Sequence, residues 1–510
     1  MFNFKTNAEN YFDHIKSINN LKSLFSVSIE TGSLIIIPFS REIKNSNFYQ
    51  KLSFKEEKNS QVFFIYDNKF DFIGCLNIEI PKEVEETVEI NKISVVNNNN
   101  DLVLEAIQLI ANWSKEHLLC KNVLVKGFNI EIKDKDFSTK PKNKILTAGP
   151  LVSNFEKLYV QDAVENGWNN DWGKYLDEFE TEFKKFTETN FALATSSCTG
   201  SLYLSLLALD IGPGDEVIVP ELTWVASASA IKYTGADPVF VDVNKDDWTM
   251  SAENISELIT SKTKAIMPVH LYGNPSEMDK IMEIADSNNL NVIEDAAPAI
   301  GATFNKKKVG SFGDIGCFSF QGAKLLVTGE GGMIVTDNEK LYKRLFKLNN
   351  HGRIPGTFWI DELGYKFNMS NMQAAFGLGQ LKNINLLINA KRKIYQRYFQ
   401  NLSNIKSISF NKPIQNSESI FWMTSITINP ETGNETEKFI DYLNKENIDT
   451  RPIFPPISQY PIWNKKYKPQ PNAKYISDNS INLPSGVKLK NSEIDYISEK
   501  IIQYLNKIGG

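Results

Sequence analysis

The stretch "IGCFSFQGAKLLVTGEGG", residues 315–332, decides the fold of most of this chain. It begins with a short apolar run that indicates a buried strand, and it ends in a glycine-rich turn. Lys324 stands between the two. A lysine in that position is either a solvated surface residue or an amine held in a pocket for chemistry, and the rest of the chain has to decide between these interpretations.

Other short, nearly all-apolar runs precede this stretch, at residues 216–220, 238–243, 265–273 and 291–297. Helical patterns at residues 178–188 and 198–210 accompany them. Such runs predict an α/β fold with a mostly parallel sheet covered by helices on both faces. Ligands of such sheets bind at the carboxyl ends of the strands. We therefore expect Asp295, Ser319 and Lys324 on the ligand side.

These residues suit the chemistry of pyridoxal 5′-phosphate (PLP). PLP needs an amine for a Schiff base, a carboxylate for its pyridine nitrogen, a helix N-terminus for its phosphate and a flat side chain over its ring. Lys324 and Asp295 supply the first two, "TSSCTG" (195–200) opens a helix, and Trp224 follows a strand. Taken singly, a strand-end Asp, an N-capping stretch and a Trp are more often structural. Their order and shared placement favour the cofactor.

Residues 145–494 resemble the DegT/DnrJ/EryC1/StrS family of sugar aminotransferases, which are fold-type I PLP enzymes. Long segments carry this resemblance, including "GPGDEVIVPELTWVASASAIKYTGADPVFVDV", "TKAIMPVHLYGNPSEMDKI", "VIEDAAPAIGA" and "GYKFNMSNMQAAFGLGQL". It implies a large PLP-binding domain over residues 147–385 and a small C-terminal α/β domain over residues 386–510.

The resemblance also implies roles for individual residues. Lys324 would form the Schiff base and carry the proton, and Asp295 would pair with the pyridine nitrogen. The remaining cofactor contacts would come from Ser197, Cys198, Thr199, Trp224, Ser319 and Lys366. Gln321 and Arg451 are candidate substrate contacts.

Several positions depart from the family pattern, among them Cys198, where Gly is common, and Gln321, where some relatives have His. Pro298 stands where many relatives have a side chain near the ring hydroxyl of PLP, and Lys366 stands where many have Asn. Lys366 belongs to "GYKFNM" (364–369), which matches a loop that reaches the active site of the partner subunit. The resemblance therefore implies a homodimer with shared sites.

The implied reaction moves an amino group from L-glutamate, which becomes 2-oxoglutarate, to a keto sugar. The stretch around Lys324 is most similar to perosamine-synthase-like members, which favours a nucleotide-linked 4-keto-6-deoxyhexose and a role in surface polysaccharide biosynthesis. Three alternatives stay open: a bifunctional aminotransferase and N-acyltransferase, an aminotransferase for a small phosphorylated ketone, and a non-catalytic PLP-binding regulator.

Composition excludes several other functions. The chain has 510 residues and a net charge of −5, so no global basic field attracts nucleic acid. No apolar run reaches the ~20 residues needed to span a membrane, and the N-terminus lacks the apolar core of a signal peptide. The four cysteines and four histidines are scattered without metal-site spacing. We therefore expect a cytoplasmic protein without a metal.

The N-terminal part is expected to be a separate module. Residues 132–146 are polar and predict a linker after a domain at residues 1–131. Strand patterns at residues 33–39, 61–66, 72–80 and 122–128, with a helical pattern over 101–116, indicate a mixed α/β domain. It faintly resembles a GNAT-type acyltransferase, but "VVNNNNDLVLEA" replaces the glycine-rich loop that would hold coenzyme A. We therefore expect the domain to be either an active acyltransferase or a degenerate or purely structural module.

Overall fold

The computed structural model describes residues 29–30, 34–38, 60–67, 72–79, 87–95, 122–125, 128–129, 140–433, 435–463 and 467–508. Contacts between Cα atoms group the chain into two units. The first contains Met1–Asp136 with Val152–Leu158, and the second contains Phe137–Leu151 with Tyr159–Gly510. Each unit is described by itself.

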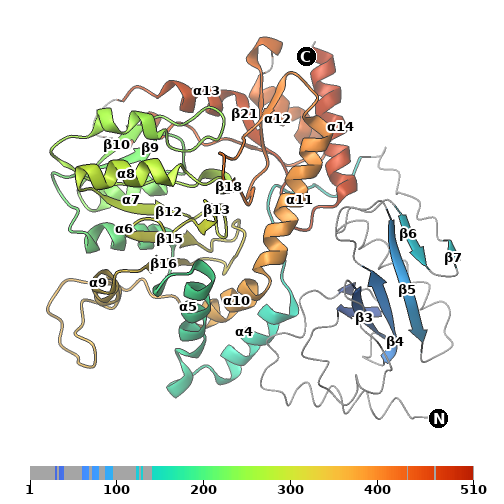
Figure 1. Cartoon of the computed structure of the whole chain (residues 1–510), viewed down its shortest axis with the longest axis horizontal. Coiled ribbons are helices and arrows are strands. Elements are labelled where there is room, and N and C mark those ends of the chain that lie inside the picture. The colour runs from blue at the N-terminus through green and yellow to red at the C-terminus, as the bar shows by residue number, and fades with distance from the viewer. Residues whose placement is uncertain are drawn as a thin grey trace. The chain divides into compact units, whose positions relative to one another are not determined.

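Within Met1–Asp136 of the first unit, the described residues form one sheet in which the strands follow their chain order (Figure 1). Neighbouring strands pair antiparallel except β5 and β6, which pair parallel. The helix predicted over residues 101–116 lies outside the described residues. The strands are β1 (Ile29–Glu30), β2 (Leu34–Pro38), β3 (Ser60–Asp67), β4 (Phe72–Glu79), β5 (Thr87–Val95), β6 (Asn122–Val125) and β7 (Phe128–Asn129).

Strand β5 is absent from the sequence prediction, and its pairing with β4 explains why. Asn77 pairs with Lys92 but the next residue, Ile78, pairs with Ile90, so one residue of β5 is bulged out. In "TVEINKISV" the apolar alternation slips at the same place. A bulge therefore hides the period of two that identifies a strand.

The second unit is built on a seven-stranded sheet in the order β10-β9-β11-β12-β15-β16-β8. Six strands run parallel, and β16 runs in the opposite direction between β15 and β8. This confirms the predicted mostly parallel α/β fold. The strands are β8 (Phe191–Thr195), β9 (Glu216–Pro220), β10 (Asp237–Val241), β11 (Thr263–Ile266), β12 (Asn291–Asp295), β15 (Ile315–Ser319) and β16 (Gly332–Thr336).

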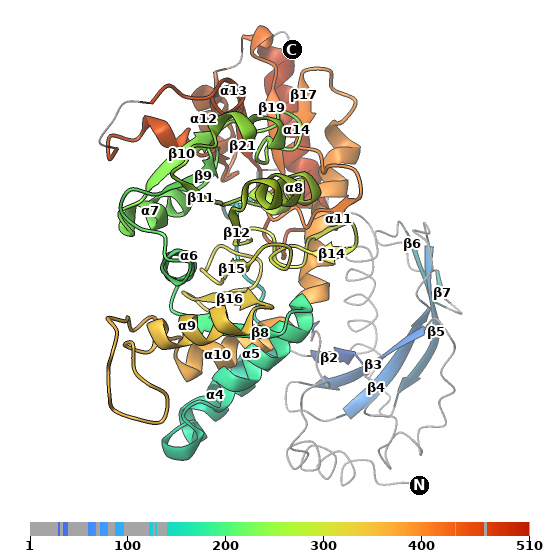
Figure 2. The same cartoon turned by 60° about the vertical axis from the view of Figure 1, so that its left-hand side comes forward.

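Helices cover both faces of this sheet. Figure 2 shows α6 and α7 on one side and α8 on the other, with α5 and α10 beside the β8 edge. The helices of this part of the chain are α4 (Asn154–Asn166), α5 (Lys174–Thr187), α6 (Cys198–Ala208), α7 (Ala226–Tyr233), α8 (Met278–Asn288), α9 (Glu339–Asn349), α10 (Asn371–Lys382), α11 (Ile384–Leu402), α12 (Thr436–Lys445), α13 (Pro471–Asn479) and α14 (Asn491–Ile508).

The predicted strand over residues 265–273 is wrong in its extent, because β11 ends at Ile266. Pro268 follows and cannot donate a ladder hydrogen bond. The chain then turns through Tyr272 and Gly273, which have positive φ angles of 52° and 99°. This irregular stretch brings the Tyr272 ring into the candidate site described below.

A second, four-stranded sheet lies in the C-terminal part, in the order β17-β19-β21-β20. Its strands are β17 (Ile408–Phe410), β19 (Ser425–Ile428), β20 (Arg451–Pro452) and β21 (Ser480–Asn482). They share a core with α11, α12 and α14. Three short strands, β13 (Thr303–Phe304), β14 (Lys307–Lys308) and β18 (Ser417–Glu418), form a third sheet.

Ile145, at the end of the predicted linker, belongs to this C-terminal core. It is 6% exposed, and its amide donates a hydrogen bond of 2.8 Å to the carbonyl of Asn447. The division at 385/386 stays a prediction, because the contacts keep residues 159–510 in one unit. In the parts of the chain that the structure describes, no helix is both long enough and apolar enough to cross a membrane.

Candidate active site

The site is organised by the ends of two neighbouring parallel strands. β12 ends at Asp295, which pairs with Cys317 of β15, and β15 ends at Ser319. Asp295 and Ser319 are both buried, with 5% and 8% of their surface exposed. The strand pattern in the sequence therefore leads to a polar edge at the place where α/β proteins bind ligands.

Lys324 lies in the connection between β15 and β16, and hydrogen bonds between its two ends hold this loop closed. Phe320 N donates to Gly331 O and Gly322 N donates to Gly329 O, each at 2.9 Å. Lys324 N donates to Gln321 O at 2.8 Å. The backbone that carries the lysine is thereby fixed relative to the sheet.

Gly332 joins this loop to the N-terminus of α6. A Cβ atom at Gly332 would lie 2.7 Å from the amide nitrogen of Cys198 and 2.7 Å from the carbonyl carbon of Ser197, so only glycine fits. Ser197 is the N-cap of α6, and its hydroxyl accepts a hydrogen bond of 3.1 Å from Gly200 N. The amides of Cys198 and Thr199 belong to the first turn of α6, and a helix N-terminus favours an anion.

Asp295 is a buried carboxylate without a cation in hydrogen-bonding contact among the described residues. Oδ2 accepts a hydrogen bond of 2.7 Å from Ser227 Oγ, and Oδ1 accepts one of 3.1 Å from Ala297 N. Burial raises the pKa of Asp295, and the hydrogen bonds from Ser227 and Ala297 oppose that shift. Sequence reasoning missed Ser227, because a serine inside a helix gives no signal of its own.

The amine of Lys324 is also held in a buried environment. Burial lowers the pKa of Lys324 to about 8, while the negative charge of Asp295 acts in the opposite direction. A lysine with this pKa is present in both protonation states near neutral pH, as a proton carrier requires.

An aromatic wall leads from Trp224 to Lys324. The ring centroids of Trp224 and Phe454 are 5.5 Å apart, those of Phe454 and Tyr272 are 5.5 Å apart, and those of Tyr272 and Trp422 are 6.0 Å apart. The Lys324 Nζ atom lies 3.9 Å from the centroid of Trp422. Trp224 was predicted, but the other three rings come from distant segments that no local pattern connects.

The side chain of Gln321 forms a hydrogen bond within the loop between β15 and β16 that carries Lys324, here called the lysine loop. Its Oε1 accepts a hydrogen bond of 2.9 Å from Ala323 N, although Gln321 itself is exposed. Its predicted contact with substrate stays a prediction.

Lys366 lies beside the segment that precedes α6. The adjacent Phe367 O accepts a hydrogen bond of 2.5 Å from Ser196 N. The Asn368 amide is oriented so that its nitrogen donates to Asn349 O and its oxygen accepts a hydrogen bond of 3.2 Å from Lys366 Nζ. Lys366 is therefore near the predicted phosphate site within its own chain.

Arg451 is separated from these residues. Its guanidinium lies 3.3 Å from Oδ2 of Asp449, and its side chain is 67% exposed. Among the described residues no contact joins Arg451 to Lys324 or Asp295. Only Phe454, three residues further along the chain, reaches the aromatic wall.

The carboxylate of Glu294 anchors the end of β12 through hydrogen bonds. Its carboxylate accepts hydrogen bonds from the amides of Gly310, Phe312 and Gly313 at 2.6–2.8 Å and contacts His270 Nε2 at 3.0 Å. Nδ1 of His270 accepts from Ser276 N, so Nε2 carries the proton that faces Glu294. These hydrogen bonds fix the residue that directly precedes Asp295 on β12.

The residues that are present fit PLP. Asp295 is a carboxylate that lacks a cationic partner and would suit a pyridinium. Gly332 leaves room at the α6 N-terminus that a larger residue would fill. Lys324 is close enough to be influenced by both Asp295 and Cys198. These features match the three charged or reactive parts of the cofactor.

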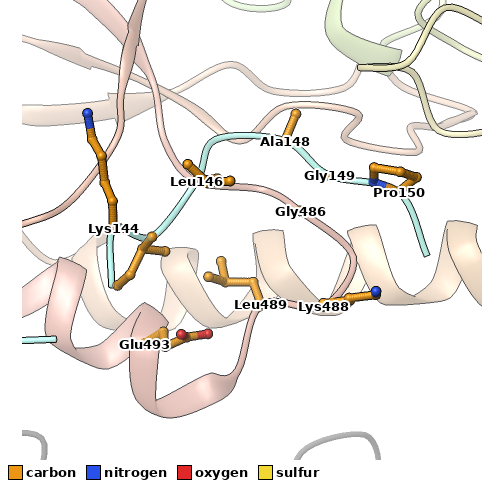
Figure 3. Close-up of a pocket in the computed structure, with 10 residues that line it drawn as sticks. Lys144, Leu146, Ala148, Gly149, Pro150, Gly486, Lys488, Leu489 and Glu493 are labelled. Carbon is orange, nitrogen blue, oxygen red and sulfur yellow. The ribbon is translucent and has the colours of Figure 1, made fainter. Parts of the chain in front are cut away.

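A cavity of about 260 Å³ lies elsewhere in the same unit (Figure 3). Figure 3 shows the strap of residues 144–150 on one side and Gly486, Lys488, Leu489 and Glu493 on the other. None of the predicted site residues lines it. The candidate site is therefore identified by its chemistry and not by this cavity.

Comparisons with known proteins agree with this geometry. The model of the DegT/DnrJ/EryC1/StrS aminotransferase family matches residues 150–502. GDP-perosamine synthase of Escherichia coli O157:H7 is 42% identical over 70% of this chain and 97% of its own length. The spore coat polysaccharide biosynthesis protein SpsC of Bacillus subtilis is 33% identical over 69% of this chain and 95% of its own length.

Solved structures give the same result. Spr1654 of Streptococcus pneumoniae, in a PLP form, aligns with a TM-score of 0.67 and 28% identity, covering 72% of this chain and 99% of its own. Residues before 150 lie outside the family match.

Proposed function

Because this chain belongs to the DegT/DnrJ/EryC1/StrS family and is a PLP-dependent sugar aminotransferase, we propose that its amino donor is L-glutamate and its acceptor a nucleotide-linked 4-keto-6-deoxyhexose. The lysine loop between β15 and β16 supports the amino-transfer chemistry, because Asp295 and Cys198 at the start of α6 both act electrostatically on Lys324. The 42% identity to a GDP-perosamine synthase supports the sugar class.

In this proposal each residue of the site has a defined task. When bound, PLP supplies a carrier for the amino group and an electron sink. Lys324 anchors it and, as a free amine, moves the proton between the donor's α carbon and the carrier. Asp295 keeps the pyridine nitrogen protonated, and Ser227 orients Asp295 through the 2.7 Å hydrogen bond.

The remaining contacts hold the cofactor in place. Ser197, Cys198 and Thr199 would bind the phosphate through the first turn of α6, joined by the Ser319 hydroxyl and, from the second copy of the chain, by the charge of Lys366. Trp224, which is 56% exposed, would cover the ring. Gln321 and Arg451 remain candidates for contact with the sugar or its nucleotide.

The proposal includes a homodimer with shared sites. The segment that leads to Lys366 exposes several large apolar side chains, with Phe358 at 95%, Leu363 at 84% and Trp359 at 70%. Apolar groups gathered on one exposed loop are typical of a protein–protein contact. A second copy of the chain is the proposed partner, and a cytoplasmic location is proposed with it.

The first experiment is a visible absorption spectrum of the purified protein before and after addition of L-glutamate. We expect a yellow band from bound PLP that disappears with glutamate and returns when a GDP-linked 4-keto-6-deoxyhexose is added. A band that glutamate leaves unchanged would instead favour a PLP-binding regulator. A band restored by a small phosphorylated ketone, but by no nucleotide sugar, would contradict the proposed substrate.

A further inference from the structure

The amine of Lys324 has one aromatic partner and no acceptor. Its Nζ lies 3.9 Å from the ring centroid of Trp422, well within cation–π distance. Within the described residues, no oxygen accepts a hydrogen bond from this amine and no carboxylate forms an ion pair with it. The indole face of Trp422 is therefore the group that defines where the amine rests.

Trp422 is itself held firmly. Its Nε1–H donates a hydrogen bond of 2.8 Å to the carbonyl of Ala323, the residue directly before Lys324. Its own carbonyl accepts a hydrogen bond of 2.7 Å from Nζ of Lys391, and its ring stacks on Tyr272 at an interplanar angle of 29°. Because Trp422 is only 6% exposed, the ring has little room to move.

The Lys391 contact is unusual in its own right. Lys391 is 4% exposed, and besides Trp422 O its amine donates to the carbonyl of Ser485. Removal of this buried amine would leave the Trp422 carbonyl without its hydrogen-bond donor. Hydrogen bonds therefore fix both the backbone and the ring of Trp422.

We propose that the face of Trp422 is the resting place of the Lys324 amine whenever that amine is not bonded to the cofactor, and that Trp422 is thus a positioning residue for proton transfer. This inference rests on the proposed role of Lys324. The amine must leave the cofactor and then act on a carbon close by. A fixed aromatic face keeps it near without competing for it through a covalent bond or a strong ion pair.

The chemistry of the contact suits this task. A π face stabilises the ammonium form, but less than a buried carboxylate in contact would. The other titratable groups that act on Lys324 are Asp295 and Cys198. A weak attraction lets the same nitrogen take up a proton and release it again.

The test compares Trp422→Leu, which removes the π face, with Trp422→Phe, which keeps a smaller one. The first readout is the rate at which cofactor-free protein captures PLP as a function of pH, because only the unprotonated amine attacks the aldehyde. We expect the midpoint to move down by about half a unit to one unit in Trp422→Leu, and less in Trp422→Phe.

The second readout is the glutamate half-reaction with α-deuterated donor. We expect a rate at least about tenfold lower in Trp422→Leu, a larger isotope effect and little change in the glutamate concentration that gives half the maximal rate. Trp463→Leu is the matched control, since the Trp463 indole donates to a backbone carbonyl, Ile457 O, at 2.6 Å without contacting Lys324. Both readouts should match the wild type in this control.

Two results would overturn the inference. One is a PLP-capture midpoint in Trp422→Leu equal to that of the wild type, and the other is an equal loss in the Trp463→Leu control. If the Leu variant does not fold, the Phe variant alone decides through its shifted or unshifted midpoint. Failure of the wild-type protein to react with glutamate would instead contradict the proposed function itself.

Discussion

The hydroxyl of Ser227 donates a hydrogen bond of 2.7 Å to Oδ2 of Asp295, and this bond orients the buried carboxylate. Ser227 lies on α7 and Asp295 ends β12, so the bond joins a helix to the strand edge. Hydrogen bonds to charged groups contribute about 1.5–3 kcal/mol. We expect Ser227→Ala to weaken PLP binding by about tenfold or more, measured by spectroscopic titration of cofactor-free protein. Unchanged affinity would show that Asp295 needs no orienting partner.

Loss of the Lys324 amine should abolish the reaction. In Lys324→Ala the amine that anchors the cofactor and moves the proton is gone, so turnover should fall by about a thousandfold or more. Lys324→Arg keeps a positive charge but cannot form the same bond, and it should be equally inactive. Amino-sugar formation, followed by chromatography, checks both variants. Substantial turnover by either one would contradict the assigned role.

The charge of Asp295 should affect both the cofactor and the lysine. Asp295→Asn removes the carboxylate that keeps the pyridine nitrogen protonated, so we expect turnover to drop by about a hundredfold or more. It also removes a negative charge that raises the pKa of Lys324 and so opposes the burial that lowers this pKa to about 8.

The influence of Asp295 on the pKa of Lys324 can be measured directly. PLP capture by cofactor-free wild-type protein should be slow below pH 8, where the amine is protonated, and fast above it. In Asp295→Asn the midpoint should lie at lower pH, because the ammonium form has lost a stabilising charge. A midpoint that moves upward would mean that the two side chains are not coupled as described.

Gly332 should not tolerate a side chain. In Gly332→Ala the new methyl group would press on Ser197 and Cys198 at 2.7 Å and displace the first turn of α6. We expect weaker affinity for PLP, and for inorganic phosphate as a competitor of PLP. Gly173→Ala is a suitable control, since nothing lies within 4 Å of a Cβ atom there. Equal affinities in the two variants would exclude a phosphate site at this helix.

Glu294 should contribute to stability. Glu294→Ala would leave three amides, one buried and two partly buried, and the buried His270 without their acceptor, at a cost of about 3 kcal/mol or more. The melting temperature, measured by calorimetry, should fall by several degrees. The control Glu339→Ala affects an exposed carboxylate on α9 that pairs with Lys343, so its melting temperature should stay close to that of the wild type. Similar melting temperatures in the two variants would contradict this role.

The sequence was sufficient for the parts of the fold that follow local rules. The strand at residues 216–220 has the predicted bounds, because a short apolar run between helices is a strong signal. β5 was missed because its bulge interrupts the alternation, and β11 was drawn too long because the apolar run continues past Pro268. In both cases the backbone departs from the regular period.

For the candidate site, the sequence likewise predicted only the residues whose position follows from local patterns. Asp295, Ser319 and Lys324 follow strands and were found by their position. Ser227, Tyr272, Trp422 and Phe454 come together only through tertiary packing, and each taken alone has the pattern of an ordinary core residue. The sequence does not show that these four residues lie close together in space.

The reversed direction of β16 has a consequence for how this site can vary. Because β16 returns directly beside β15, the twelve residues between Ser319 and Gly332 are pinned at both ends by hydrogen-bonded strands. An insertion or deletion in that loop would move Lys324 relative to the α6 N-terminus. Insertions and deletions that change sugar preference are therefore expected outside it, in the segment around Phe454 and in surface loops, whereas within it only substitutions such as those at Gln321 can do so. The site divides into a cofactor half of fixed length and a substrate half that is free to diversify.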